Sequence, residues 1–472
     1  MVMESGKAFK RLYAPEYLLG KRSWNGEAYT TGQVYKSLSN VAWPAAAEAV
    51  LIGLMAFVDT MMVATVGSSA IAATGLTNQP RMLFFAIFFA LNAGVTAIVS
   101  RRRGEHDSVG ANKCLAQALL ICLGLSIIVC GLALGVARPM MYFAGANEDT
   151  IEDGVVYFRI TMVGMAFTSL GMVINAAQRG IGNTKISMRT NLIANGVNVV
   201  FNYLLINGIW IFPRLEVKGA AIATLLGNIV SCIMSFVSVL HRDYFLYIGK
   251  KENFRYDGEY VRLLIKISSS AAVEQLFVRV GFFFYTKTVA GLGTLALATH
   301  NICMSIISLS FTVGDGLGIG SASLVGQSLG RKRPDLAVIY GKAAQRIGLL
   351  ISTALVALFW QGGGLLVGLF TKDQEIINMG IKLLYIVAAA SPAQVSQLVF
   401  SGSLRGAGDT KFVAYSSLVS MGLIRPIITY ILCFPLGLGL IGAWISLLID
   451  QYMRLSFSAF RFSRGKWLEI KI

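Results

Sequence analysis

Charged residues are scarce in this chain. Asp, Glu, Lys and Arg make up only 14% of its 472 residues, whereas an ordinary soluble chain has about a quarter. Hydrophobic residues make up 55%, and the mean hydropathy is +0.64. So few charges could not cover the surface of a soluble enzyme of this length, and the apolar content excludes a disordered or fibrous protein. We therefore expect a polytopic membrane protein.

The residue types that build metal and nucleotide sites are also few or badly spaced. The three histidines are scattered, and the six cysteines lie in or beside apolar runs without metal-ligand spacing. The glycine-rich stretch Gly314–Gly320 lacks the phase and the Lys-Ser/Thr pair of a phosphate loop. Its glycines are expected to allow close helix packing or a bend. With no nucleophile motif either, we expect no metal, no enzymatic cofactor and no enzyme.

The net charge of +17 does not indicate nucleic-acid binding, because the basic residues lie in short segments between apolar runs. The positive-inside rule explains that distribution, and no nucleic-acid partner is expected. Residues 1–35 lack the apolar core of a signal peptide before Val41. We expect them to form a basic cytoplasmic tail, which includes Lys7, Lys10 and Arg11 and whose charge suits anionic lipid headgroups.

Long apolar runs predict twelve membrane spans. At about 1.5 Å per residue, each run can cross a hydrocarbon core of roughly 30 Å. Seven runs contain no charged residue: Met82–Ser100, Cys114–Ala137, Ile160–Gln178, Thr190–Pro213, Gly219–Leu240, Ile347–Thr371 and Leu383–Leu404. Five further spans carry internal charges, at about 41–66, 267–292, 301–328, 412–434 and 439–460.

The distribution of Lys and Arg predicts the orientation. An even number of spans places both termini on one side of the membrane. If that side is the cytoplasm, 31 of the 41 Lys and Arg residues lie inside and three lie within spans. Only seven lie outside: Arg81, Arg138, Arg159, Arg214, Lys218, Lys372 and Lys382. We therefore expect a plasma-membrane protein with both termini cytoplasmic.

An internal repeat divides the chain. The string RGIGNTK at Arg179–Lys185 recurs as RGAGDTK at Arg405–Lys411, 226 residues later, and the same offset relates Glu48 to Glu274. Each half holds six spans, so both halves insert with the same topology, as in parallel-repeat transporters. We predict an all-α membrane protein whose twelve helices form two six-helix bundles. The expected segments are a tail at 1–35, an N-lobe at 36–242, a cytoplasmic linker at 243–265, a C-lobe at 266–462 and a cytoplasmic C-terminus at 463–472.

Polar side chains at span depth are costly and indicate function. Asp59 and Glu48 are 11 residues apart in the first span, close to three helical turns, so they share a face. The fifth span has a stripe of four asparagines, Asn191, Asn195, Asn198 and Asn202, and Thr224 lies in the sixth. A carboxylate with amides and a hydroxyl could hold a proton or Na⁺.

Structural roles for these groups are open as alternatives. The asparagines could instead join helices by hydrogen bonds, Asp59 could pair with a basic residue, and Glu48 could face water at the inner leaflet. In the second half, Glu274 is either neutralised by Arg279, which is poorly phased for a bridge on the same helix, or faces a cavity. The i,i+4 spacing of Asp450 and Arg454 predicts a structural pair.

Four strings in order across both halves resemble the multidrug and toxic compound extrusion (MATE) family. They are VDTMMVATVG at Val58–Gly67, VKGAAIAT at Val217–Thr224, LVGQSLGRKRPDLA at Leu324–Ala337 and LRGAGDTK at Leu404–Lys411. The resemblance covers nearly all of the chain beyond the tail. It implies two six-helix lobes that export amphipathic, mostly cationic drugs or metabolites in exchange for H⁺ or Na⁺.

The resemblance also implies roles for individual residues. Asp59 matches the acid of the N-lobe cation site, Asn198, Asn202 and Thr224 match its partners, and Glu274 matches the acid of the C-lobe. Two departures leave the coupling ion open. Some members have an aspartate at the position of Asn202, and others have one where this chain has Gln394. Glu274, Glu48, Gln394 and Asp315 are the candidates for a substrate site or second cation site.

The function predicted from the sequence is therefore a cation-coupled antiporter that works by alternating access, as a monomer with small-molecule substrates and membrane lipid as partners. The alternative is a lipid-linked oligosaccharide flippase of the same superfamily. For a pyrophosphate headgroup, however, only Arg279 and Arg425 are obvious deep cations. A passive channel would not need paired acids in a two-lobed repeat.

Overall fold

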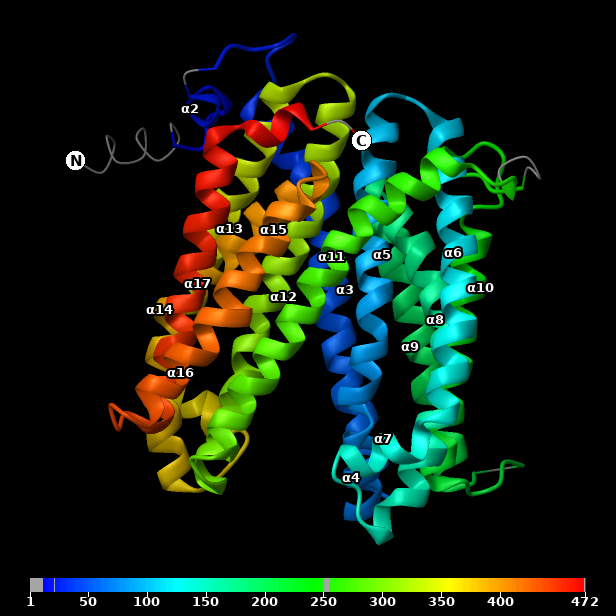
Figure 1. The fold of residues 1–472 in the computed structure, drawn as a ribbon, viewed down its shortest axis with the longest axis vertical. Coiled ribbons are helices and arrows are strands. Elements are labelled where there is room, and N and C mark those ends of the chain that lie inside the picture. Colours follow the sequence, from blue (N-terminus) through cyan, green and yellow to red (C-terminus); the bar gives the residue numbers. More distant parts are fainter. Residues whose placement is uncertain (1–11, 21, 210, 250–253, 471) are drawn as a thin grey trace. The chain divides into compact units, whose positions relative to one another are not determined.

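The computed structural model describes residues 12–20, 22–209, 211–249, 254–470 and 472, and within them every regular element is a helix (Figure 1). The helices are α2 (Pro15–Leu19), α3 (Thr31–Ala64), α4 (Ser68–Leu76), α5 (Asn78–Gly104), α6 (Ser108–Gly135), α7 (Ala137–Phe143), α8 (Glu148–Gly180), α9 (Thr184–Asn207), α10 (Glu216–Val237), α11 (Gly258–Ala290), α12 (Thr294–Gly330), α13 (Pro334–Gly368), α14 (Gln374–Gly406), α15 (Thr410–Ser417), the π-helix η2 (Leu418–Ile424), α16 (Arg425–Cys433), α17 (Gly439–Arg464) and the 3₁₀ helix η3 (Lys466–Glu469).

Helices occupy all twelve predicted span positions, so the all-α membrane fold is confirmed. In the described part of the chain, nine helical segments are long and apolar enough to cross a membrane, counting α4 with α5 and α15 with α16 as continuous segments. The other three positions are occupied by α9, α11 and α17. The asparagine stripe lowers the hydropathy of α9, and internal charges do the same for α11 and α17.

The chain folds as two compact units. One consists of the residues up to Ala46 together with Ser269–Ile472, and the other of Ala47–Ser268. We call them the C-unit and the N-unit. Their boundaries fall inside α3 and α11, whereas the predicted lobe limits were drawn at loops, and those limits remain a prediction.

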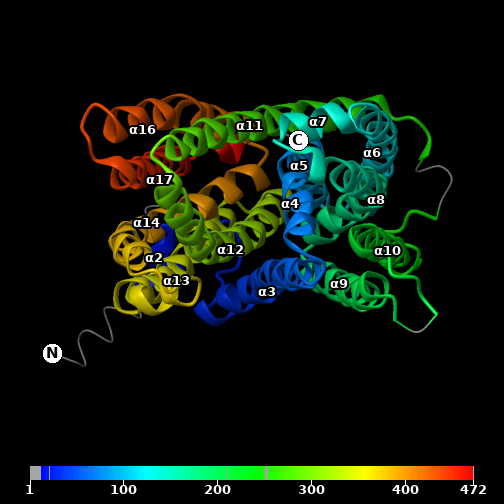
Figure 2. The same cartoon turned by 90° about the horizontal axis from the view of Figure 1, so that it is seen from below.

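In the N-unit, α8 is the central helix, and α5, α6 and α10 pack against it while α9 packs against α10 (Figure 2). Two helices begin at clear caps. The Asp107 side chain accepts a hydrogen bond from the Gly110 amide at 2.8 Å at the start of α6, and Asn147 with Thr150 forms a capping box at the start of α8. These caps satisfy amide groups that the first helical turn leaves unpaired.

In the C-unit, α14 packs against α12, α13 and α17. The contact between α12 and α14 depends on glycine, because a Cβ on Gly402 would overlap the backbone of Gly318 and a Cβ on Gly406 would overlap the Ala322 carbonyl. The predicted role of the glycine-rich stretch in close helix packing is therefore confirmed for Gly318. The C-unit also contains an apolar core in which Trp444, Tyr285 and Phe359 are fully buried.

Gly406→Ala is expected to destabilise the protein by about 1–3 kcal/mol, because the added methyl group meets rigid backbone. Gly180 is the repeat equivalent and provides the matched control, since its Cβ would lie 3.2 Å from the Thr96 carbonyl oxygen, a contact that a small shift can relieve. Thermal unfolding in detergent should show the larger fall in midpoint for Gly406→Ala. Equal falls would contradict this account of the packing.

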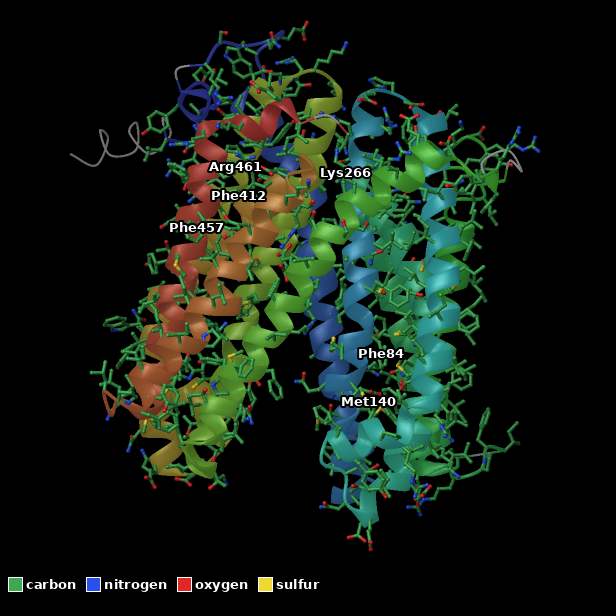
Figure 3. All side chains as sticks on the ribbon, in the orientation of Figure 1. Phe84, Met140, Lys266, Phe412, Phe457 and Arg461 are labelled. Carbon is green, nitrogen blue, oxygen red and sulfur yellow. The ribbon has the colours of Figure 1, made fainter. Side chains whose placement is uncertain are left out.

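The eleventh span contains a π-helical segment, η2, between α15 and α16. Pro426, the second residue of α16, has no backbone N–H, so a regular α-helical ladder cannot continue through it. The same span is tied to α17 near its beginning. The Arg461 guanidinium pairs with Asp409 at 2.7 Å and lies 5.1 Å from the centre of the Phe412 ring (Figure 3).

The described part of the predicted tail packs within the C-unit, against α13. Leu18 and Leu19 of α2 are buried in a cluster with Leu336 and Ile339 of α13. The tail residues Lys7, Lys10 and Arg11 lie outside the described residues.

Candidate functional site

The four predicted N-lobe residues come together in the N-unit, on α3, α9 and α10. The Asn202 side-chain amide donates a hydrogen bond to Asp59 and another to the side-chain oxygen of Asn198 at 3.3 Å. The Asn198 amide in turn donates to the Thr224 hydroxyl at 3.3 Å. Asp59, Asn202, Asn198 and Thr224 are thus one continuous hydrogen-bonded chain.

This chain of polar groups is buried but not closed. The Asn202 side chain is fully buried, and its carbonyl oxygen has no hydrogen-bond partner among the residues that the structure describes. Asp59 is half-buried. Among the described residues no Lys, Arg or His nitrogen lies within 4.0 Å of its carboxylate, although Arg81 of α5 is within electrostatic range. The alternative of a fixed ion pair for Asp59 is therefore not found in this part of the chain.

Two asparagines of the stripe each contact a different acid of α3. Asn202 contacts Asp59 and Asn191 contacts Glu48, and in both contacts the partners are 143 positions apart. Within the N-unit, α3 and α9 therefore run side by side in the same direction, with matching contacts about three turns apart. The periodicity of the sequence predicted both polar faces, and the structure shows that they meet.

Glu48 is held by three side chains rather than facing water. It accepts hydrogen bonds from the Ser187 hydroxyl at 2.8 Å and the Asn191 amide at 2.5 Å. The Arg179 guanidinium lies 3.9 Å from the same carboxylate and donates to Ser187 at 3.1 Å. With Glu48 only 8% exposed, this cluster joins α3 to the α8–α9 connection.

Glu274 of α11 is 2% exposed and pairs with Arg405 at the end of α14. The guanidinium makes two contacts to the carboxylate, one of them at 3.4 Å. The sequence alternative of neutralisation by Arg279 is not found. Reasoning from the sequence missed both Arg405 and its equivalent Arg179, although they are the first residues of the repeated strings and are 226 positions apart, as are Glu274 and Glu48.

The remaining candidates in the second half are not joined into one site. Gln394 is fully buried, and within the described part of the chain neither the nitrogen nor the oxygen of its amide has a hydrogen-bond partner. Asp315 is exposed on α12, within electrostatic range of Arg405. Among the described residues, no hydrogen bond or ion pair connects either side chain to Glu274.

The predicted pair of Asp450 and Arg454 is wrong. The basic residue nearest to Asp450 is Arg425 of α16, with nitrogen and oxygen 3.9 Å apart, and both side chains are almost fully buried. The Arg454 guanidinium instead approaches the sulfur of Met421 at 4.0 Å. Local spacing on a helix favours an i,i+4 pair, but here the buried Arg425 of a neighbouring helix lies closer to the Asp450 carboxylate.

The repeat equivalent of Asp59 is not an acid. An offset of 226 leads to Tyr285 of α11, which is fully buried. The Arg425 guanidinium lies 4.1 Å from the centre of the Tyr285 ring, a cation–π contact. The first half therefore has a carboxylate without a fixed cation, whereas the second half has a tethered cation on an aromatic ring.

Within the described residues, no group of three or more His, Cys, Asp or Glu side chains could hold a metal ion. Tyr157 of α8 is a further side chain near the Asp59 network. It is 5% exposed and within electrostatic range of Asp59 and Arg81. Its position on α8 reaches the network only through helix packing, so no pattern in the sequence indicated it.

A duplicated set of membrane-crossing helices with polar groups buried at span depth is the architecture of a secondary transporter. The MatE family model matches the chain twice, over residues 44–204 and 270–431, and the two matches begin 226 residues apart. The chain belongs to the MatE family of transporters. The double match also confirms the internal repeat.

Relatives match over nearly their whole length. YisQ of Bacillus subtilis (strain 168), an uncharacterized transporter, is 27% identical over 92% of this chain and 95% of its own. A probable multidrug resistance protein NorM of Thermotoga maritima is 24% identical over 92% of this chain and 93% of its own.

Solved structures share the fold. A MOP superfamily transporter from Pyrococcus furiosus Vc1 superposes with a TM-score of 0.86, at 21% identity, over 94% of this chain and 100% of its own. An outward-facing multidrug resistance MATE family transporter of the MOP superfamily gives a TM-score of 0.85, at 21% identity, over 93% of this chain and 100% of its own.

Proposed function

We propose that this transporter is a cation-coupled antiporter, which exports amphipathic, mostly cationic drugs or metabolites in exchange for H⁺ or Na⁺. The observation that carries the proposal is the Asp59 network: a buried chain of oxygen and amide groups around one carboxylate with no basic partner within 4.0 Å in the described structure. The NorM relatives described as probable multidrug resistance proteins support the substrate class.

The network offers ligands that suit a proton or a hard cation. A proton would bind the Asp59 carboxylate, and Na⁺ would take that carboxylate with neighbouring neutral oxygens. The side-chain carbonyl oxygen of Asn202 is buried and has no hydrogen-bond partner in the described ranges, so it is the ligand that a cation would use at least cost. In the proposed cycle, bound and free forms of Asp59 favour different conformations of the transporter, and substrate favours the free form.

We propose that the exchangeable cation binds in the first half of the chain only. At the equivalent position of the second half, Tyr285 replaces the carboxylate and the Arg425 guanidinium lies on its ring, so a second cation would meet no acid at this position. The pairing of Arg425 with Asp450 also removes one of the two deep cations on which a flippase of pyrophosphate-linked lipids would depend. We further propose the plasma membrane as the location, with both termini cytoplasmic, because of the Lys and Arg distribution.

The test is ethidium efflux from proteoliposomes under an imposed pH gradient and, separately, under a Na⁺ gradient. A tenfold gradient of the coupling ion contributes about 1.4 kcal/mol and should drive up to about tenfold accumulation of a substrate exchanged one for one. One of the two gradients should drive concentrative transport, and its dissipation should stop it. Efflux that depends on neither gradient would contradict the proposal, and so would transport of lipid-linked oligosaccharide alone.

A further inference from the structure

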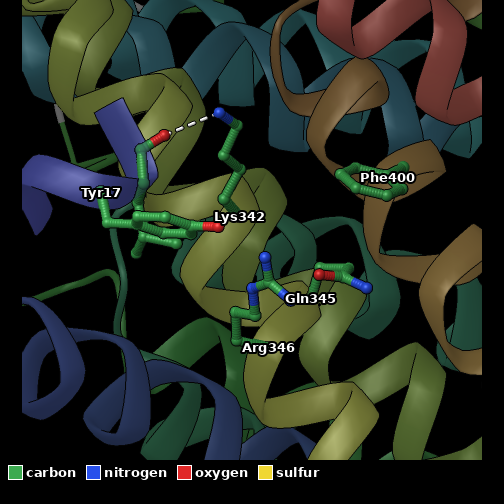
Figure 4. Close-up of a pocket in the computed structure, with 6 residues that line it drawn as sticks. Tyr17, Lys342, Gln345, Arg346 and Phe400 are labelled. Atoms are coloured by element: carbon green, nitrogen blue, oxygen red, sulfur yellow. Dashed lines mark hydrogen bonds between the residues drawn. The ribbon is translucent and has the colours of Figure 1, made fainter. Parts of the chain in front are cut away.

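A pocket in the C-unit lies outside the ion network and outside the proposed transport function. It has a volume of about 360 Å³ and is lined by Tyr17 and Leu18 of α2, by Lys342, Gln345 and Arg346 of α13, and by Phe400 of α14 (Figure 4). In Figure 4 the Lys342 and Arg346 side chains extend from α13 toward the α2 segment.

The sequence places this pocket at the membrane–water interface. The uncharged run Ile347–Thr371 starts directly after Arg346, and the uncharged run Leu383–Leu404 ends one turn after Phe400. At 35 residues and about 1.5 Å per residue, α13 exceeds a hydrocarbon core of roughly 30 Å, so its first three turns extend beyond that core. The ends of the uncharged runs in α13 and α14 therefore both place the pocket at the level of the lipid headgroups.

The pocket carries positive charge that nothing in the described structure neutralises. Neither Lys342 nor Arg346 has a carboxylate oxygen within 4.0 Å among the described residues. Lys342 donates one hydrogen bond, to the Leu18 carbonyl oxygen at 2.7 Å, and Arg346 is half-buried without one in that part of the chain. Arg22 adds to the positive potential at Lys342. Two half-buried cations without a counter-charge favour an anionic ligand.

The apolar and aromatic surface beside Lys342 and Arg346 favours a lipid anion over an inorganic one. Leu350, one turn beyond Arg346 on the same helix face, is 51% exposed, so an apolar surface continues from the pocket toward the hydrocarbon core. Tyr17 and Phe400 add aromatic surface at the interface, where such rings are favoured. An inorganic anion would use only the cations, whereas a phospholipid would use the cations and the apolar surface together.

The α2 segment, which lines one side of the pocket, is held to α13 by several contacts. Leu18 and Leu19 pack into an apolar cluster with α13. Beyond α2, the backbone N–H of Asn25 donates to the Asp335 carboxylate at 3.2 Å, and the Arg333 guanidinium donates to the Glu27 backbone carbonyl at 2.8 Å. The segment before the first span is thus fixed to the start of α13 from both sides of the turn that follows α2.

We propose that this pocket binds the phosphate of an anionic phospholipid in the leaflet that borders α2, with phosphate oxygens accepting hydrogen bonds from Lys342 and Arg346 and an acyl chain lying along Leu350. The bound lipid ties the N-terminal segment to α13.

The test uses the delipidated full-length protein in detergent, titrated with phosphatidylglycerol and followed by native mass spectrometry. The double variant Lys342→Gln/Arg346→Gln is expected to bind about 30-fold more weakly than the native protein, because a basic residue near an anionic lipid contributes about a factor of five. The matched control Lys372→Gln/Lys382→Gln removes the same charge from two exposed positions and should leave binding unchanged. Arg346→Lys, which keeps the charge, should retain most of the binding even if the double variant folds poorly.

Any one of four outcomes would overturn the proposal. The first is unchanged phosphatidylglycerol binding by Lys342→Gln/Arg346→Gln, and the second is an equal loss in the control variant. The third is displacement of phosphatidylglycerol by millimolar inorganic phosphate, and the fourth is equal binding of phosphatidylcholine, since either of these two results would remove the anionic lipid as the specific ligand.

Discussion

Asp59→Asn is expected to abolish ion-driven efflux while leaving the protein folded. The substitution keeps the size of the side chain and its contact with Asn202 but removes the carboxylate that would take the cation. Under a tenfold gradient of the coupling ion, concentrative efflux should fall from up to about tenfold to none, because the gradient of about 1.4 kcal/mol is no longer transmitted. Ethidium efflux from proteoliposomes measures this directly.

Measurements of substrate binding and of thermal unfolding distinguish a loss of ion coupling from a loss of folded structure. Asp59→Asn protein should still bind substrate and should keep its thermal unfolding midpoint, since Asp59 has no ion pair to lose in the described structure. Asn195→Ala is the matched control on α9, because this half-buried asparagine belongs to the same stripe and yet makes no hydrogen bond to Asp59 or Glu48. Undiminished ion-driven efflux by Asp59→Asn would remove Asp59 from the mechanism.

Arg405→Gln is expected to destabilise the protein by about 3–5 kcal/mol, the usual result of leaving a buried charge without its partner. Glu274 has a side chain that is 3% exposed, and Arg405 is the basic group that neutralises it. The fall should appear as a lower thermal unfolding midpoint in detergent, together with reduced recovery of folded protein.

Two variants test the physical reason for that loss. Arg179→Gln, at the equivalent position of the first half, should cost only about 1 kcal/mol, because Glu48 keeps its hydrogen bonds from Ser187 and Asn191. Glu274→Gln/Arg405→Gln should recover most of the stability, since it removes both charges. If the double variant were as unstable as Arg405→Gln, the loss would come from packing and not from the unpaired carboxylate.

The sequence was enough to predict the spans, the repeat and the polar face of the fifth span. These features depend on local composition and on periodicity, and both can be read along the chain. The 11-residue spacing of Asp59 and Glu48 matches that of Asn202 and Asn191, so the four side chains meet in pairs wherever the two helices run side by side.

The partners of the buried charges could not be predicted in this way. Arg405 and Arg179 lie at the ends of helices and reach the acids only through tertiary packing. Asp450 shows the same limit, because local spacing favoured Arg454 while the fold supplies Arg425 from another helix. The docking of α2 on α13 was also missed, since a five-residue helix carries almost no periodic signal.

The central claim is that Asp59 binds the exchangeable cation, and difference infrared spectroscopy of the purified protein tests it most directly. Adding substrate should change the absorption of one carboxyl group as it releases H⁺ or Na⁺, and this band should vanish in Asp59→Asn while it persists in Asp315→Asn. A carboxyl band that survives in Asp59→Asn, or the absence of any substrate-dependent carboxyl band in the native protein, would contradict the account.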